Sequence, residues 1–557
     1  MLNIKNLSIF FLQNKKIEAA VHDVSFSLYQ NEILGMVGES GSGKSITSLA
    51  LLGLLPKGIA KVDGAIFYNE ENINTYSEKA FQKIRGRKIA MIFQEPMSSL
   101  NPTLTCGYQV AEILKQHTQF SKREIYTAVI SLFEKVKLPR ASSIFKAYPH
   151  QISGGQKQRV MIAMAIACKP EILIADEPTT ALDVTVQKEI ILLLKELQQE
   201  YGMSILFITH DLALVSEIAD RLVVMYKGSI VEQGSTKEVF LNPQKNYTKA
   251  LINSKPNLEL RLNTLPTVTD FINETVDNTV YTKEDRARFH EKIYQKTPLL
   301  EIRNLKKEFI TKGAWFQKDE VVKAVNNISF QIFEGETLGL VGESGCGKTT
   351  LGRTILHLEK ATSGQVLFGG KDITQLSKTG LKKLRKDIQI IFQDPFSSLN
   401  PRITVGNAIV EPMKVHSILS NKKERITYVL NLLKKVGLEE EHFNRYPHEF
   451  SGGQRQRIGI ARTIALQPKL IICDESVSAL DVSVQAQVLN LLNELKATFN
   501  FTYIFISHDL SVVKYMSDQL VVMNQGEIEE IGDADVIYKA PKTTYTKTLI
   551  ASIPEGI

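Results

Sequence analysis

Cysteine is scarce in this chain. The 557 residues include four cysteines, Cys106, Cys168, Cys346 and Cys473, and no two of them form a C-x-x-C pair. Scattered cysteines of this kind predict neither a zinc site nor a disulfide framework. We therefore expect the protein to work in a reducing compartment.

Long apolar runs are also absent. No uninterrupted hydrophobic stretch reaches the roughly 18 residues that a membrane span requires. Lys5 interrupts the start of the chain, and no small-residue cleavage site follows a hydrophobic core, so we predict no signal peptide. The protein should not cross a membrane by itself, although a partner could hold it on one.

The charge balance is mild for a chain of this length. The formal net charge is +7, which neither requires nor excludes nucleic acid and suits work near an anionic membrane surface. Hydrophobic residues make up 43% and charged residues 23%, which indicates a globular rather than a disordered protein. A chain this long exceeds one ordinary core, so we expect two or more domains.

What the sequence does have is two loops of the form G-x-x-x-x-G-K-[ST]. The first follows a predicted strand at 33–37 and precedes a predicted helix at 46–55, which is the context of a phosphate-binding loop. Glycines let consecutive N–H groups form an anion-binding nest, the lysine reaches the outer phosphates, and the last hydroxyl is a Mg²⁺ ligand. The residues predicted to bind nucleotide are Gly38, Glu39, Ser40, Gly41, Ser42, Gly43, Lys44 and Ser45, and Gly342, Glu343, Ser344, Gly345, Cys346, Gly347, Lys348, Thr349 and Thr350.

The order of motifs is repeated, which indicates one domain used twice. Phe93-Gln94-Glu95-Pro96 is matched by Phe392-Gln393-Asp394-Pro395, and Ser153-Gly154-Gly155-Gln156 by Ser451-Gly452-Gly453-Gln454. We predict domains at 1–256 and 298–557, each with a C-terminal extension. A polar stretch at 257–297 is predicted to be the linker between them.

Apolar segments alternating with helical patterns predict the fold class. Strands are expected at 2–9, 24–28, 172–175 and 205–208, and again at 300–302, 328–332, 470–473 and 503–506. The later strands of each half are apolar on both faces, as in a parallel sheet. The stretches 103–147 and 403–446 have helical spacing. The prediction is α/β, with two tandem P-loop domains that each combine a mixed or parallel sheet with an α-helical subdomain.

Each half has an apolar strand that ends in two acids, Asp176-Glu177 and Asp474-Glu475. The first acid is placed to hold Mg²⁺, and the second to orient and activate the attacking water. A solvated strand end would explain one such pair, but not two pairs that each follow a phosphate loop. The Ser-Gly-Gly-Gln segment, before a helix expected near Lys157, adds a second phosphate-binding feature.

With these motifs in this order, the chain resembles tandem ATP-binding cassette (ABC) proteins over nearly all of both halves. The resemblance implies that the cassettes close head to tail over two ATP molecules. The first phosphate loop would work with the signature Ser451, Gly452, Gly453 and Gln454, and the second loop with Ser153, Gly154, Gly155 and Gln156.

The resemblance also assigns roles to single residues. Gln94 and Gln393 would sense Mg²⁺ and the γ-phosphate, and Asp183 and Asp481 would cross the dimer interface. His210 and His508 would contact the γ-phosphate and support the catalytic Glu177 and Glu475. The adenines would stack on Phe11 and Phe309, although Phe10 and Phe316 lie nearby. Because both halves keep their acids, histidines and signature serines, we expect two competent sites. Ser476 stands where the family usually has proline.

Local sequences resemble the peptide/nickel branch of bacterial importers. These are the stretches 93–102 and 392–401, Tyr-Pro-His at 148–150 and 446–448, and Pro-x-x-x-Tyr-Thr at 243–248 and 541–546. The fused arrangement resembles the glutathione-type and broad peptide-type importers. It implies ATP and Mg²⁺, two integral-membrane permease subunits, an extracytoplasmic substrate-binding protein that acts indirectly, and a place on the cytoplasmic face of the bacterial inner membrane. No iron–sulfur cluster is expected, because no cysteine lies between Cys168 and Cys346.

Two other classes share the catalytic motifs. One is a soluble tandem cassette ATPase that acts on ribosomes or nucleic acid, and the other is an exporter cassette. The importer-type segments, the absence of zinc cysteines and a linker without a dense basic run argue against nucleic acid as a partner. The cargo stays open among dipeptides, longer peptides, glutathione and peptide-like antibiotics.

Overall fold

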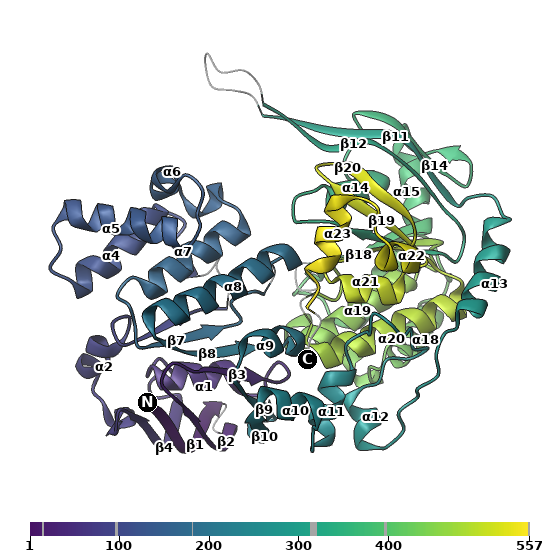
Figure 1. The fold of residues 1–557 in the computed structure, drawn as a ribbon. Helices are drawn as coiled ribbons and strands as arrows, with labels where there is room; N and C mark the ends of the chain where they lie inside the picture. Colours follow the sequence, from purple (N-terminus) through teal and green to yellow (C-terminus); the bar gives the residue numbers. More distant parts are fainter. Residues whose placement is uncertain are drawn as a thin grey trace. The chain divides into compact units, whose positions relative to one another are not determined.

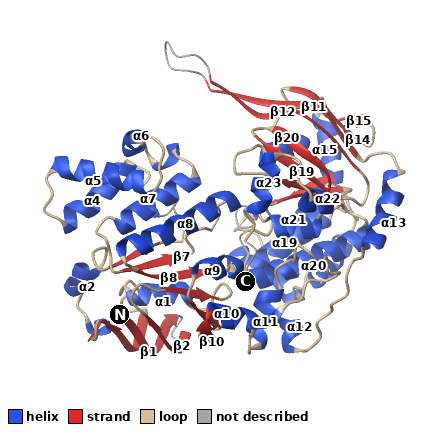
Figure 2. Cartoon of the chain, in the orientation of Figure 1, coloured by secondary structure: helices blue, strands red, loops and turns tan. Residues whose placement is uncertain are grey.

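The computed structural model describes residues 1–13, 16–94, 99–180, 182–311, 320–394, 398–478 and 480–554. The chain folds into two compact units. Unit 1 contains Met1–Ile252 and Val268–Thr275, and unit 2 contains Asn253–Thr267 and Val276–Ile553. Figures 1 and 2 trace the elements of both units. Each unit combines an antiparallel sheet, a mainly parallel sheet and helices, so the predicted fold class is confirmed.

Unit 1 has two sheets. The antiparallel sheet has the order β2-β1-β4-β5, and the second has the order β10-β9-β3-β8-β7-β6. In the second sheet β10 pairs antiparallel with β9, and the other pairings are parallel. The strands are β1 (Leu2–Gln13), β2 (Lys16–Leu28), β3 (Ile33–Val37), β4 (Ala60–Tyr68), β5 (Glu71–Asn72), β6 (Ile89–Ile92), β7 (Ile172–Asp176), β8 (Ser204–Thr209), β9 (Arg221–Tyr226) and β10 (Ser229–Ser235).

The predicted helical stretch 103–147 contains α4 (Cys106–His117), α5 (Lys122–Lys135) and α6 (Ala141–Lys146), and α7 (Gly154–Ile166) follows it. The other helices of unit 1 are α1 (Lys44–Leu51), α2 (Glu78–Ile84), α8 (Val184–Tyr201), α9 (Leu212–Ile218), α10 (Thr236–Leu241), α11 (Asn246–Asn253) and α12 (Val268–Ile272). Within the described ranges of both units, no helix combines the length and the hydropathy that crossing a bilayer would require.

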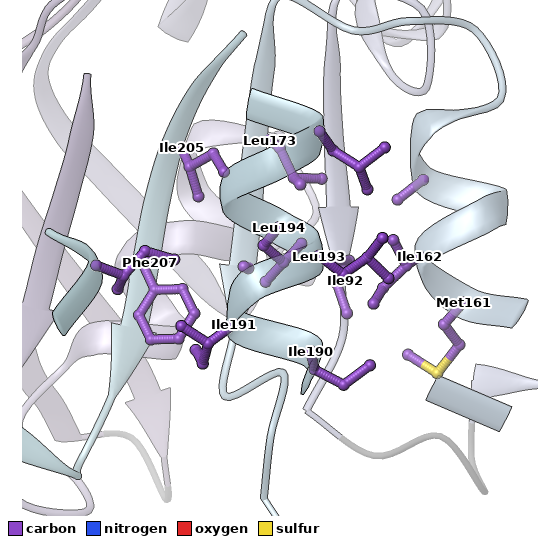
Figure 3. Packing of buried hydrophobic residues seen from close by; sticks show 14 of the residues in the cluster. Ile92, Met161, Ile162, Leu173, Ile190, Ile191, Leu193, Leu194, Ile205 and Phe207 are labelled. Carbon is purple, nitrogen blue, oxygen red and sulfur yellow. The ribbon is translucent and has the colours of Figure 1, made fainter. Parts of the chain in front are cut away.

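The central strands of unit 1 carry its core. Every residue of β3, β7 and β8 is buried. Helices such as α8 cover one face of these strands, and helix α1 with the antiparallel sheet covers the other. Figure 3 shows how helix α8 places Ile190, Ile191, Leu193 and Leu194 over these strands, near Leu173 and Phe207. Each fully buried side chain of this kind stabilises the fold by roughly 1.5–3 kcal/mol. The carboxyl ends of the strands are thereby held in fixed positions.

Unit 2 repeats this architecture. Its sheets have the orders β12-β11-β14-β15 and β16-β17-β18-β13-β19-β20. The strands are β11 (Leu300–Thr311), β12 (Glu320–Ile332), β13 (Thr337–Val341), β14 (Ser363–Phe368), β15 (Lys371–Asp372), β16 (Ile388–Ile391), β17 (Leu470–Asp474), β18 (Thr502–Ile506), β19 (Gln519–Asn524) and β20 (Glu527–Asp533). The helices are α13 (Lys283–Tyr294), α14 (Lys348–Ile355), α15 (Lys378–Asp387), α17 (Val405–Val415), α18 (Lys422–Lys435), α19 (Gly452–Ile464), α20 (Val482–Phe499), α21 (Leu510–Met516), α22 (Ala534–Lys539) and α23 (Thr544–Ala551).

Two helices begin earlier than the sequence predicted. Helix α1 begins at Lys44 rather than at 46, because Gly43 takes the left-handed N-cap conformation. Helix α7 begins at Gly154 rather than near Lys157. Ser153 caps it, since the Ser153 hydroxyl accepts from the N–H of Gln156 and the Gln156 side chain accepts from the N–H of Ser153. The signature serine is therefore also a helix cap, and Ser451 repeats this arrangement.

We keep 257–297 as the proposed linker, although much of it packs on unit 2. The Arg261 guanidinium donates to the carbonyls of Lys514 and Ser517 at 2.6 and 2.9 Å. On α13, Arg286 is 7% exposed and donates to Asp533 at 2.9 Å and Asp535 at 2.6 Å. The polar residues of 257–297, which indicated a linker, therefore include an arginine that is buried in ion pairs with unit 2.

Beside this segment, Glu336 leads to a stability prediction. In unit 1 the equivalent Glu32 lies 3.1 Å from Arg221, but unit 2 has Gln519 at the position of that arginine. Burial raises the pKa of Glu336 to about 7. The hydrogen bonds that its carboxylate accepts from Phe333 N–H and the Tyr294 hydroxyl lower the pKa, but they do not offset burial. Between pH 4.5 and 7 the folded unit keeps a proton that the unfolded chain releases, so stability falls as pH rises.

The Glu336→Gln variant should lose this pH dependence, which is worth about 3 kcal/mol. Calorimetry of the full chain at pH 5 and pH 8 measures it through the unfolding transition of unit 2. Glu32→Gln is the matched control and should destabilise unit 1, because it leaves Arg221 without its carboxylate. An unchanged pH dependence in Glu336→Gln would contradict the prediction.

Candidate active site

The first phosphate loop joins β3 to α1 and is shaped by glycines in left-handed conformations. The φ angles of Gly38, Gly41 and Gly43 are 152°, 78° and 99°. A Cβ atom at Gly38 would lie 2.1 Å from the carbonyl oxygen of Met225, so only glycine fits there. The Lys44 side chain is 4% exposed, and its ammonium donates to the carbonyls of Gly38 at 2.7 Å and Glu39 at 2.8 Å.

The second loop, between β13 and α14, has the same geometry. A Cβ atom at Gly342 would lie 2.2 Å from the carbonyl oxygen of Met523. The Lys348 ammonium donates to the carbonyls of Gly342 at 2.7 Å and Glu343 at 2.9 Å. Cys346 replaces the serine of the first loop, and its sulfur lies 3.7 Å from Lys348 Nζ. Burial raises the pKa of the Cys346 thiol, so it is mainly protonated at neutral pH.

The first acid of each pair meets the hydroxyl of its phosphate loop. The Ser45 hydroxyl donates to Asp176 Oδ1 at 3.1 Å, and the Thr349 hydroxyl donates to Asp474 Oδ1 at 3.0 Å. Burial raises the pKa of Asp176 to about 6 and also raises the pKa of Asp474. A hydroxyl and a carboxylate supply the hard oxygen ligands that Mg²⁺ prefers. The positive charge of the ion would also favour the ionised form of the buried acid.

The second acid of unit 1 is held by two side chains from other elements. Gln94 Nε2 donates to Glu177 Oε2 at 3.0 Å, and His210 Nδ1 lies 3.3 Å from the same oxygen. Glu177 has a φ of 48°, and its N–H donates to the carbonyl of Ile208 at 2.9 Å. Burial alone would raise the pKa of Glu177, but the contact with His210 lowers it to about 2. The carboxylate is ionised and therefore able to accept a proton from water.

Unit 2 repeats this arrangement. Gln393 Nε2 donates to Glu475 Oε2 at 2.7 Å, His508 Nδ1 lies 3.4 Å away, and Glu475 also has a φ of 48°. Glutamate rarely takes a left-handed backbone conformation, yet Glu177 and Glu475 both take it directly after the corresponding strands. The backbone therefore orients both side chains in the same way.

Comparison with known proteins agrees with this geometry. The family model "ABC transporter" matches residues 21–180 and 325–478. The chain belongs to the ABC transporter family. A second model, "Oligopeptide/dipeptide transporter, C-terminal region", matches residues 231–274 and 530–556 of this ABC ATPase. The protein is an ATP-hydrolysing enzyme, as the motifs predicted.

The ABC ATPase has full-length relatives. The "Glutathione import ATP-binding protein GsiA" of Escherichia coli O157:H7 is 46% identical over 566 residues, which cover 100% of this chain and 89% of the relative. The proteins of the same name from Escherichia coli K12 and Shigella flexneri match with the same identity and coverage. Among solved structures, a dimeric ATP-binding cassette bound to ADP and phosphate is 30% identical, with a TM-score of 0.39, and covers 42% of this chain and 98% of that chain.

Asp183 and Asp481, predicted at a dimer interface, cap helices within their own units of the ABC ATPase. Asp183 Oδ1 accepts from the N–H of Val186 at 3.0 Å, and Asp481 Oδ1 accepts from the N–H of Val484 at 2.9 Å. The alanines before them, Ala181 and Ala479, lie outside the described residues, as do 95–98 and 395–397 of the glutamine segments. The interface role stays a prediction.

The predicted adenine platforms lie on the first strand of each unit. Phe11 pairs with Glu18 across β1 and β2 and packs against the core, and Phe309 pairs with Val322 across β11 and β12. Phe309 is 40% exposed, and Lys307 Nζ lies 4.6 Å from its ring centroid. Of the nearby phenylalanines, Phe10 has its ring centroid 6.0 Å from Lys61 Nζ, and Phe316 lies outside the described residues.

Glu177 and Glu475, the acids predicted to be catalytic, differ in one contact. The Thr180 hydroxyl donates to Glu177 Oε2 at 2.9 Å, whereas the Ser478 hydroxyl donates to the backbone carbonyl of Glu475 at 2.9 Å. Thr180→Val should therefore slow turnover at the first site by about 5–10-fold, because one hydrogen bond of about 1 kcal/mol no longer orients the acid. Ser478→Ala should leave the second site within twofold. Both variants are tested by single-turnover hydrolysis in chains whose other site carries its Glu→Gln change. Equal effects of Thr180→Val and Ser478→Ala would contradict the prediction.

Two tyrosines to which the sequence motifs assign no role contact the phosphate loops. The Tyr247 hydroxyl accepts from the N–H of Glu39 at 3.1 Å, and the Tyr545 hydroxyl accepts from the N–H of Glu343 at 3.0 Å. Both belong to the repeated Pro-x-x-x-Tyr-Thr motif, which by itself indicates only the branch of the family. The duplication of the motif was the available signal.

Proposed function

We propose that this ABC ATPase energises a bacterial importer for peptides or peptide-like substrates of the dipeptide, oligopeptide or glutathione class. The observation that carries the proposal is the C-terminal region of oligopeptide/dipeptide transporters, which matches in both halves. Full-length relatives named as glutathione import ATP-binding proteins support it. We found no feature that favours action on ribosomes or nucleic acid.

The chemistry of each site follows from the residues described. The phosphate loop binds the phosphates of ATP through its N–H groups and its lysine, Lys44 or Lys348. Mg²⁺, held by Ser45, Asp176 and Gln94 or by Thr349, Asp474 and Gln393, would neutralise phosphate charge. Glu177 or Glu475 orients the attacking water and accepts its proton, and His210 or His508 holds that carboxylate. The groups given these roles lie within one unit, and the signature segments discussed next would complete the site.

The complete ATP site is proposed to form in the closed state. There the signature segments that begin at Ser153 and Ser451 would contact the nucleotide bound by the other cassette, and Asp183 and Asp481 would line the interface. ATP would then stabilise the closed state by differential binding, and loss of the γ-phosphate would release it. This assignment rests on the doubled motifs of the sequence.

A groove beside the glutamine segment of unit 2 supports the proposed permease contact. It has a volume of about 280 Å³ and is lined by apolar groups of Leu358, Phe392 and Pro412. Phe392 is 40% exposed, and its counterpart in unit 1, Phe93, is 42% exposed. The buried Nε2 atom of Gln456, in the groove wall, has no hydrogen-bond acceptor among the described residues. The lining also includes polar side chains, among them Arg385, His416 and Arg462. A groove of this mixed character fits a short amphipathic helix of a permease subunit.

The test is a tagged pull-down from detergent-solubilised native membranes, with hydrolysis blocked by Glu177→Gln and Glu475→Gln, read by mass spectrometry. We expect two polytopic permease subunits, which would place the protein on the cytoplasmic face of the inner membrane. The binding protein that acts with those permeases can then be tested for cargo. Ribosomal proteins or nucleic acid without a permease would contradict the proposal.

Two double variants with exposed apolar side chains removed test whether the groove contacts the permease. Phe93→Ala with Phe392→Ala should reduce permease recovery by at least tenfold while ATP binding is kept. Leu241→Ala with Val536→Ala removes apolar side chains that are 53% and 57% exposed elsewhere, on α10 and α22, and should leave recovery unchanged. Equal recovery with both pairs would remove the groove from the proposal.

A further inference from the structure

The repeated Pro-x-x-x-Tyr-Thr motif places one tyrosine at each phosphate loop. Tyr247 lies on α11 and is 6% exposed, and Tyr545 lies on α23 and is partly buried. Each hydroxyl accepts a hydrogen bond from the second residue of the loop, Glu39 N–H at 3.1 Å and Glu343 N–H at 3.0 Å. The same contact in two units that differ in much of their sequence indicates a selected arrangement rather than a packing accident.

The tyrosine holds one side of a peptide unit whose other side is held by the lysine of the same loop. The carbonyl of Gly38 accepts from Lys44 Nζ at 2.7 Å, and the N–H of the same peptide group, which belongs to Glu39, donates to Tyr247. In unit 2 the peptide group between Gly342 and Glu343 is held in the same way, by Lys348 at 2.7 Å and by Tyr545. The orientation of this peptide group sets the direction in which the loop leaves the strand.

The two contacts differ in their place relative to the nucleotide. The Lys44 ammonium has three donors, and it would turn at least one of them to the phosphates when nucleotide binds. The tyrosine binds the opposite side of the peptide group, so its contact is compatible with bound nucleotide. It holds the entry of the loop, with Gly38 at a φ of 152°, whichever partners the lysine takes.

The segment that carries each tyrosine is itself tied to the last strand of the sheet. Glu232 on β10 accepts from the N–H groups of Gln244 at 2.8 Å and Lys245 at 3.2 Å, just before α11. Glu530 on β20 accepts from the N–H groups of Lys542 and Thr543 before α23. A carboxylate that accepts two backbone N–H groups fixes the approach of the helix, and hence the position of the tyrosine hydroxyl.

We propose that Tyr247 and Tyr545 are positioning residues for ATP binding, through which the C-terminal region of each cassette holds the phosphate loop in its nucleotide-binding conformation. The inference rests on the proposed role of the two loops as the ATP sites. Preorganising a loop lowers the cost of ordering it on binding, so the effect falls on ATP affinity more than on the chemical step.

The test is Tyr247→Phe with Tyr545→Phe, which removes two hydroxyls and keeps both rings. The KM for ATP should rise by about 5–10-fold, while kcat at saturating ATP falls by less than twofold. Equilibrium dialysis of each single variant, with the other loop disabled by Lys348→Ala or Lys44→Ala, should show the same loss of affinity at each site. A purely structural role would lower the melting temperature and leave the KM unchanged.

Tyr538→Phe is the matched control. Its hydroxyl donates to the backbone carbonyl of Leu510 at 2.5 Å and is buried, and unit 1 has Phe240 at the equivalent position. It should leave the KM unchanged although it also removes a buried hydrogen bond. A second route to the same contact is Glu232→Ala with Glu530→Ala, which frees the segments that carry the tyrosines and should raise the KM in the same direction.

The outcomes separate the inference from the function on which it rests. If Lys44→Ala with Lys348→Ala abolishes ATP binding but the tyrosine variants keep the wild-type KM, the inference alone is overturned. A KM rise in Tyr538→Phe equal to that of the tyrosine pair would overturn it as well. If the double lysine variant still binds two ATP molecules, the loops are not the ATP sites, and both proposals are overturned.

Discussion

Replacing Glu177 and Glu475 together by glutamine is expected to reduce ATP turnover by about 10²–10⁴-fold while ATP binding is kept. Glutamine has nearly the size of glutamate, and its carbonyl can still accept from Gln94 or Gln393. It carries no negative charge, however, and cannot accept the proton of the attacking water. The low pKa of Glu177, about 2, reflects its contact with His210 despite burial, so the charged form is the one that the site stabilises.

Phosphate release and ATP binding are measured separately to establish this result. Glu171→Gln is the control, because Glu171 precedes the same strand β7 at its opposite end and pairs with Lys88. It should leave turnover within twofold. A double Glu→Gln variant that hydrolyses ATP at more than a tenth of the wild-type rate would show that other groups activate the water.

Each single lysine variant, Lys44→Ala or Lys348→Ala, is expected to lower the number of ATP molecules bound per chain from two to one. Both lysines are nearly buried, at 4% and 6% exposure, and each ammonium makes short hydrogen bonds to two carbonyls of its loop. The variant loses the cation that meets the outer phosphates and also the groups that close the loop. An affinity loss of at least 100-fold, about 3 kcal/mol, is expected at the altered site.

Equilibrium dialysis with labelled ATP counts the sites directly. Lys57→Ala is a suitable control, because this lysine is 80% exposed and pairs only with Glu78 among the described residues. It should leave two sites of unchanged affinity. A wild-type chain that binds one ATP would contradict the prediction of two competent sites, as would a single lysine variant that binds none.

Much of the fold could be predicted from sequence, because the strongest signals are local. The strand before the first phosphate loop was predicted at the residues that β3 occupies, since a short apolar run directly before a phosphate loop fits a fully buried strand. The acids at the ends of β7 and β17 follow from the same reasoning, because a buried parallel strand delivers its last residues to the carboxyl edge of the sheet.

Other features depend on contacts between distant parts of the chain, and these the sequence could not reveal. The polar composition of 257–297 indicated a linker, and nothing in it showed that Arg286 would be buried beside Asp533 and Asp535 of unit 2. The tyrosine contact to Glu39 spans 208 residues of sequence. The different partners of Thr180 and Ser478 depend on side-chain rotation, which residue type alone does not determine.

Uptake in cells tests the central claim most directly. A strain that lacks this gene would be complemented with the wild-type chain or with the Glu177→Gln, Glu475→Gln chain, and the uptake of labelled dipeptide, oligopeptide and glutathione would be measured. The account predicts that deletion abolishes uptake of at least one of these substrates, that the wild-type chain restores it, and that the double variant does not. Unchanged uptake of all three in the deletion strain would contradict the proposal that this ATPase drives import of peptide-like substrates.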